Sequence, residues 1–212
     1  MKTEMKKKIK LKDLILPNKK LNYFVGTILL LGILSGSIFL MLSSQNDQTS
    51  VIRQIELFFT NISKNSIDNG LTFRNSLIVN YLFILLIWGF GFSMIFVIFT
   101  IFIAYIKGFL VGFSISSIFL TYHLKGIVGV LLYAFPSQLF NLLIVFLLTV
   151  YSLMFSNHLI KVLLSKKGNQ RSMLKKYFVI LMFCIILSFL SSVLEVYVFP
   201  RLLKLVISIY IS

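Results

Sequence analysis

The side chains that could do chemistry are few and widely spread along this chain. Its 212 residues include six Asp and Glu, two His and one Cys, and no HExxH, CxxC, GxxxxGKS/T or GxSxG motif occurs. Cys184 lies in an apolar run and is expected to pack as a small core residue. Metal sites and paired-carboxylate catalysis need several such groups in one place. The sequence therefore predicts no enzyme activity, no metal site and no cofactor.

Glu195 is the carboxylate to examine, because it falls inside an apolar run. A charge at membrane depth is costly, so it marks a candidate functional site. Counted from the predicted inner end of its span, Glu195 lies about 18 residues, or roughly 27 Å, along the helix and close to the outer interface. It could pair locally with Lys125 or Arg201, dock a partner, or lie on an ion or proton path. Local pairing is the interpretation favoured here.

Long apolar runs make up more than half of the chain. They cover residues 23–42, 76–106, 108–122, 136–164 and 177–198. Charged residues make up 13% of the chain, against about 25% in soluble proteins, and the mean hydropathy is +0.95. The composition predicts an all-α, polytopic integral membrane helical bundle, with about five transmembrane helices plus a short half-inserted or interfacial helix. We expect a basic cytoplasmic tail over residues 1–22 and a single membrane domain over residues 23–212.

The basic residues form two clusters, and these predict the topology. Of 21 Lys and Arg residues, eight fall within the first 20 positions and six more between residues 161 and 176. Basic residues beside spans stay in the cytoplasm, where they meet anionic lipid headgroups. No nucleic-acid recognition motif accompanies them. We therefore expect no nucleic-acid partner, a cytoplasmic N-terminus, an external loop over residues 43–75 and an external C-terminus.

The first half of the chain predicts two clear spans. The run over residues 23–42 is longer than the apolar part of a signal peptide and is expected to be an uncleaved span. The run over residues 76–106 is too long for one upright crossing. It is expected to tilt, or to break at the glycines within residues 88–91, and to end on the cytoplasmic side at Lys107.

The second half is predicted to hold the remaining crossings. The run over residues 108–122 is short for a full crossing, and residues 127–135 are expected to be half-inserted or interfacial. Pro136 predicts the start of a helix that runs to about residue 164, since proline is favoured in a first helical turn. The final span, over residues 177–198, carries Glu195.

Small residues at helical spacing predict close helix packing. Gly32 and Gly36 form a GxxxG pair, and Gly108, Gly112 and Ser116 lie one turn apart on one face. Such stripes let two backbones approach each other in a membrane. We expect both stripes to lie in helix–helix contacts.

The predicted outer loop contains a short amphipathic helix. Ile52, Ile55, Phe59 and Ile62 recur at helical spacing, with charged residues on the other side. This helix could lie on the outer leaflet, against a partner or, as favoured here, against its own bundle. Asp47 and Asp68 in the same loop are expected to be solvated charges.

Three stretches resemble the stage II sporulation protein M family. They are residues 107–126 (KGFLVGFSISSIFLTYHLKG), residues 135–138 (FPSQ) and residues 194–200 (LEVYVFP). The KGFxxGF and ExYVxP elements are the specific ones. The length, the Lys-rich start and the five-segment plan are similar to the family over the whole chain.

The resemblance implies a function in endospore formation. It implies a non-enzymatic scaffold in the cell membrane of a Gram-positive bacterium, on the mother-cell side of the sporulation septum. Such a scaffold recruits the peptidoglycan hydrolases named stage II sporulation proteins D and P, which remodel the septal wall for engulfment of the forespore. The candidate partner or packing residues are Glu195, Tyr197, Pro200, Pro136, Gln138, Gly108, Gly112, Gly32 and Gly36.

Two alternatives of other classes stay open at this point. A small-solute or ion transporter would use Ser137, Gln138, Asn141 and Glu195 as a polar path, with residues 108–122 and 127–135 as a broken-helix pair. An intramembrane enzyme ranks last, because the sequence offers no pair of nucleophile and base.

Overall fold

The structure is a computed structural model that describes residues 18–64, 68–129, 135–165 and 170–202. These residues form helices, and no strand occurs among them. In chain order the elements are α2 (Lys19–Leu42), α3 (Gln45–Ser63), α4 (Asn69–Gly91), α5 (Val97–Gly129), α6 (Phe135–Ser165), α7 (Gln170–Val193) and the π-helical turn η2 (Leu194–Val198).

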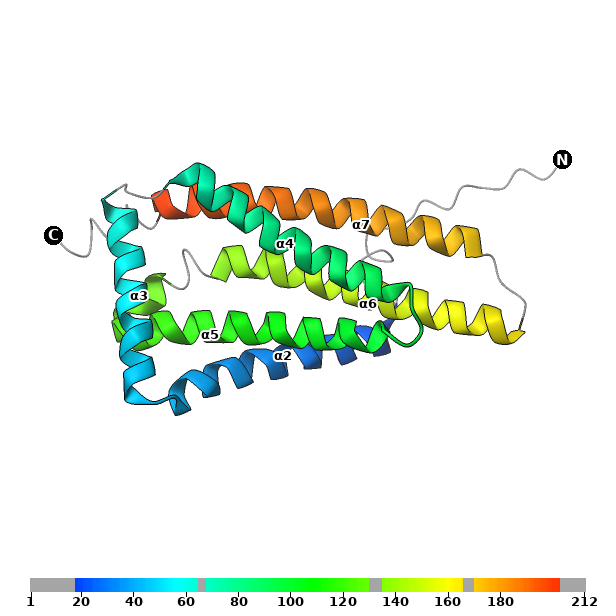
Figure 1. Cartoon of the computed structure of the whole chain (residues 1–212), viewed down its shortest axis with the longest axis horizontal. Coiled ribbons are helices and arrows are strands. Elements are labelled where there is room, and N and C mark those ends of the chain that lie inside the picture. Colours follow the sequence, from blue (N-terminus) through cyan, green and yellow to red (C-terminus); the bar gives the residue numbers. More distant parts are fainter. Residues whose placement is uncertain (1–17, 65–67, 130–134, 166–169, 203–212) are drawn as a thin grey trace.

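Five of the described helices are long and apolar enough to cross a membrane. The candidate spans are Lys19–Leu42, Asn69–Gly91, Val97–His123, Gln138–Leu164 and Arg171–Leu202. They lie side by side as an elongated bundle, and α3 lies across one end of it (Figure 1). The predicted all-α polytopic bundle is therefore confirmed.

Short polar residues begin the first three helices. The Asn18 side chain accepts from the backbone N–H of Lys20 at the start of α2. Ser44 accepts from the N–H of Asp47 at the start of α3. Asp68 Oδ1 accepts from the N–H groups of Gly70 and Leu71, at 2.9 and 3.1 Å, at the start of α4. Asp68, predicted as a solvated charge, is exposed and also caps α4.

The second crossing ends much earlier than the predicted inner end at Lys107, and that prediction is wrong. Helix α4 ends at Gly91, within the glycine-containing stretch where a break was considered, and α5 begins at Val97. The turn between them is apolar and closes with backbone bonds, including Ser93 N–H to Phe90 O at 3.1 Å. Lys107 consequently lies inside α5.

Aromatic packing accounts for this apolar turn. The hydroxyl of Tyr177 donates to the backbone carbonyl of Trp88 at 2.8 Å, and its ring stacks on Phe155 with centroids 4.7 Å apart. Phe92, the first residue after α4, packs edge-on against both Trp88 and Tyr177. These contacts hold the end of α4 against α6 and α7, and Ser93 is the polar residue of the turn, its Oγ accepting from the N–H of Phe96 at 3.2 Å.

Helix α5 corrects the prediction of a short third segment. Residues 108–122 belong to a continuous helix that begins at Val97 and gives a full crossing. A kink at His123, with φ 49° and ψ −130°, separates the span from a last helical portion that ends at Gly129. The predicted half-inserted piece over residues 127–135 lies partly outside the described residues. Helix α6 begins beside Pro136, as predicted.

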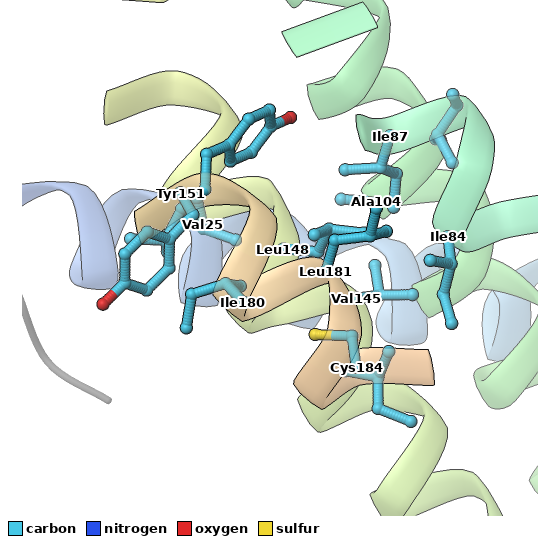
Figure 2. Close-up of a cluster of buried hydrophobic side chains, with 14 of the residues drawn as sticks. Val25, Ile84, Ile87, Ala104, Val145, Leu148, Tyr151, Ile180, Leu181 and Cys184 are labelled. Atoms are coloured by element: carbon cyan, nitrogen blue, oxygen red, sulfur yellow. The ribbon is translucent and has the colours of Figure 1, made fainter. Parts of the chain in front are cut away.

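The apolar core is formed by side chains of α6 and of the four helices around it, α2, α4, α5 and α7. Figure 2 shows Val145, Leu148 and Tyr151 among residues of the neighbouring helices. The partners are Val25 of α2, Ile84 and Ile87 of α4, Ala104 of α5, and Ile180, Leu181 and Cys184 of α7. In the most apolar stretch of the α6 span, 61% of the residues are buried inside the bundle, against 17% in the corresponding stretch of α4. Helix α6 is therefore the central helix. The outer helices keep broad apolar faces for lipid.

The two glycine stripes meet each other between α2 and α5. A Cβ on Gly36 would overlap the carbonyl of Phe109, and a Cβ on Gly112 would overlap the carbonyl of Ile33. A Cβ on Gly108 would lie 2.5 Å from the carbonyl oxygen of Leu29. Ser37 Oγ donates to the carbonyl of Gly112 across the same contact, at 3.3 Å. The stripes therefore lie in a helix–helix contact, as their spacing predicted.

Candidate functional site

Polar side chains gather between α4, α5, α6 and α7 inside the bundle. We call this group the polar core, and its members are Ser76, Asn80, Lys107, Asn141, Ser188, Ser191, Ser192 and Glu195. They come from four helices and η2 and span residues 76 to 195, so only the tertiary structure brings them together. Buried polar groups in a membrane need partners, and most of these have them.

Glu195 bonds within the chain. It lies on η2, and Ser76 Oγ of α4 donates to Glu195 Oε2 at 3.0 Å. Ser76 also lies 3.0 Å from Ser192 Oγ, and Asn80 Nδ2 donates to Ser192 Oγ at 3.3 Å. One carboxylate oxygen is thus tied to a short chain of hydroxyl and amide groups from α4 and α7.

The contact with Ser76 places Glu195 near the start of α4. Ser76 lies about seven residues, or roughly 10 Å, along α4 from Asn69 and two residues after the charged Arg74. Glu195 therefore lies toward the end of the bundle at which α4 begins. The interactions of Glu195 among the described residues are with Ser76 and Lys107 and do not include Arg201, which is exposed, and the side chain of Lys125 lies outside the described residues. The observed hydrogen-bond partner is Ser76.

Lys107 is the second charge of the polar core. Only 7% of its surface is exposed, and it lies about ten residues, or roughly 15 Å, into α5, which is half of a hydrocarbon core of about 30 Å. Its ammonium lies over the ring of Phe83, 4.9 Å from the centroid, and is attracted to the carboxylate of Glu195. Burial away from water disfavours a cation here, whereas the aromatic face and the opposite charge favour one.

A small cavity lies beside Lys107. Its volume is about 10 Å³, and polar atoms from Asn80, Lys107, Asn141 and Ser188 line it together with Phe83, Ile84, Ile144 and Val145. Ser188 Oγ has no hydrogen-bond partner among the described residues and is fully buried. On the far side, Ser191 Oγ donates to Asn141 Oδ1 at 3.3 Å.

The chemistry that this arrangement supports is electrostatic. It combines one carboxylate, one ammonium and a set of hydroxyl and amide groups. Among the described residues, no group of three or more His, Cys, Asp or Glu side chains could hold a metal ion. The polar core brings one carboxyl group and one amino group together inside the bundle, and its hydrogen bonds link α4 to α7 and η2.

The comparison with known families covers this whole region. Residues 25–200, from the first turns of α2 to the end of η2 and beyond, match the family model for stage II sporulation protein M. The chain belongs to this family. No curated protein and no solved structure matches it. Family membership makes the chain a sporulation-related membrane protein with several crossings.

In this member of the stage II sporulation protein M family, the candidate residues predicted from the sequence lie in separate parts of the bundle. Glu195 faces the polar core, while Tyr197, on the same turn, is 38% exposed and lies against Phe73 with ring centroids 6.0 Å apart. Pro200 follows η2 and is half-buried. Pro136 and Gln138 are half-buried at the start of α6, and the four glycines lie between α2 and α5. They do not form one site.

Most of the polar core was missed by reading the sequence. Lys107 was interpreted as a cytoplasmic end, and the serines of the last span were counted as part of an apolar run. Ser188, Ser192 and Glu195 recur at spacings of four and three, which places them on one helix face. Ser76 and Asn80 are four residues apart on α4. A search for polar faces within apolar runs would have found both stripes, although not that they meet.

Proposed function

We propose that this chain is a non-enzymatic membrane scaffold for peptidoglycan hydrolases. It recruits and anchors stage II sporulation proteins D and P at the septum, where the hydrolases thin the wall for engulfment of the forespore. The family match supports a role in sporulation. The polar core, in which Ser76 donates to the carboxylate of Glu195, supports a structural rather than a catalytic use of the bundle.

The proposed topology follows from the charges at the two ends of the bundle. Lys19 and Lys20 begin α2, and Arg171, Lys175 and Lys176 lie in the first turns of α7. These residues belong to the same end of the bundle, which is the cytoplasmic end by the rule that basic residues stay inside. Helix α3 lies across the opposite end (Figure 1). That end then faces the space between the mother-cell and forespore membranes, together with the C-terminus.

Helix α3 is the observation that carries the docking proposal. Phe59 and Ile62 are buried against Ile118 of α5, so the bundle fixes this helix in place. Arg53 and Glu56 are exposed on the other side. A rigid helix with an exposed polar face at the outer end is a surface on which an externally anchored hydrolase can dock.

The test of this proposal removes the exposed charges of α3. We expect Arg53→Ala combined with Glu56→Ala to abolish septal localisation of a fluorescent hydrolase while the membrane level stays normal. The matched control, Arg171→Ala with Lys175→Ala, removes two exposed charges at the other end and should leave localisation unchanged. Normal septal localisation of the hydrolase in the α3 variant would show that the exposed face of α3 is not the docking surface.

A transporter for small solutes or ions is the second candidate. Lys107 and Glu195 favour it, because ionisable residues inside a bundle often mark a pathway. The predicted broken-helix pair does not support it, since residues 108–122 form part of continuous α5. Expression separates the two functions. Transcription only in the mother cell after polar septation supports the scaffold, and constitutive transcription supports the transporter.

A further inference from the structure

Two buried residues in the centre of the bundle, Lys107 and Ser188, line the same cavity. The ammonium of Lys107 has an aromatic ring and a distant carboxylate as its neighbours, and no hydrogen bond to it occurs among the described residues. Ser188 Oγ, which is 0% exposed, likewise has none. Leaving such groups without a bond in a membrane is costly, because the lipid supplies no substitute.

The cavity between them has the size and the lining of a hydration site. Its volume of about 10 Å³ is close to the minimum that holds a single water molecule. Buried waters make about three hydrogen bonds. Lys107, Ser188, Asn80 and Asn141 all line the cavity, so both donors and acceptors are present.

We propose that this cavity binds one internal water molecule that connects Lys107 to the hydrogen-bonded chain ending at Glu195. The water accepts from the ammonium of Lys107 and donates to Ser188 Oγ and to an amide oxygen of Asn80 or Asn141. Asn80 then continues the chain to Ser192 and Ser76, and Ser76 reaches the carboxylate of Glu195.

The proposed water connects Lys107 and Glu195 through one hydrogen-bonded network. Lys107 comes from α5, Asn80 from α4, and Ser188 from α7, so the water is shared by three helices. The network also positions η2, since Glu195 is tied to α4 through Ser76. The inference concerns the interior of the bundle and does not depend on the proposed scaffold function.

Radiolytic footprinting of the full chain in lipid vesicles tests the hydration directly. X-rays generate hydroxyl radicals from bound waters, and these oxidise the side chains next to them. Ile84 lines the cavity, whereas Ile87, one turn along the same helix and equally buried, does not. We expect Ile84 to be oxidised at least several-fold faster than Ile87. Equal rates would show that the cavity is dry and overturn the proposal.

A pair of variants tests the link between the charges. We expect Lys107→Met to lower the oxidation rate of Ile84 to that of Ile87, because the main donor to the water is lost. The isosteric control Cys184→Ser alters a buried residue outside the cavity lining and should leave the ratio unchanged. Since Lys107→Met could fail to accumulate, Lys107→Met with Glu195→Gln is measured beside it. An unchanged ratio in whichever of these accumulates would contradict the proposal.

Discussion

Glu195 shows what a carboxylate needs in order to remain inside a bilayer. Ser76 supplies a hydrogen bond at 3.0 Å, and Lys107 supplies an opposite charge at a greater distance. Removing one member of a buried charge pair leaves the other uncompensated, which costs more than the pair itself contributes. The stability of this region should therefore depend on both charges together.

The first prediction concerns Glu195. We expect Glu195→Ala to destabilise the protein by about 1–3 kcal/mol, since Ser76 loses its hydrogen-bond acceptor and Lys107 loses an opposite charge. Arg201→Ala removes an exposed cation near the same turn and should have no measurable effect. Protein level in the membrane and thermal unfolding in detergent measure both. A Glu195→Ala variant that unfolds like the parent would show that the polar core contributes no stability.

The second prediction concerns the cap of α4. We expect Asp68→Ala to cost about 1 kcal/mol, because the N–H groups of Gly70 and Leu71 lose their acceptor. Asp68→Asn keeps an acceptor oxygen and should cost much less. Thermal unfolding of the two variants provides the measurement. Equal losses in both would indicate that the charge, rather than the hydrogen bonds, is what stabilises the helix start.

At the scale of the element, the contact between α2 and α5 depends on the absence of side chains. Gly32 and Gly36 face backbone atoms of α5, and Gly108 and Gly112 face backbone atoms of α2. The two helices therefore approach so closely that a hydroxyl of one reaches a carbonyl of the other. In lipid, such close packing replaces the hydrophobic effect as the source of helix association.

The third prediction tests this contact. We expect Gly36→Leu and Gly112→Leu each to lower membrane accumulation, at a cost on the order of 1 kcal/mol or more, because the backbones must separate. Gly26→Leu is the control, since Gly26 is also in α2 but has no atom within 4 Å of an added Cβ. Similar accumulation and melting of Gly36→Leu and Gly26→Leu would contradict the argument.

At the scale of the whole molecule, the bundle has two chemically different ends. One end carries the basic residues of α2 and α7, and the other carries α3, the start of α4 and the end of α7 (Figure 1). The five spans and the basic end together predict that the N-terminus is cytoplasmic and the C-terminus external.

The fourth prediction tests this orientation with single cysteines. An impermeant maleimide added to intact protoplasts should label Ser50→Cys, in α3, and Ser212→Cys at the C-terminus. Ser165→Cys, at the end of α6, should react only after the membrane is opened, because it lies at the basic end. The native Cys184 is buried and should react little. Labelling of Ser165→Cys in intact protoplasts would show that the basic end is external and would contradict the predicted topology.

The sequence by itself determined the class of the protein, most of the span positions and the glycine contact. Hydropathy depends only on the residues within a window, so each crossing can be recognised without knowing its neighbours. Pro136 and the glycine spacing are equally local signals. The turn after Gly91 was harder to place, because it is mostly apolar, with Ser93 as its polar residue and aromatic contacts around it.

Only the tertiary structure decided where the charges of the polar core lie and what they contact. The sequence predicted that the second span ends at Lys107, which put this residue at the membrane surface. In the structure α5 begins at Val97 and carries Lys107 to the centre of the bundle. Ser76 and Glu195 are 119 residues apart, and their contact depends on which faces of α4 and α7 pack together. A single helix face reveals that a polar stripe exists. Its partner is set by packing between helices, which no local pattern in the sequence contains.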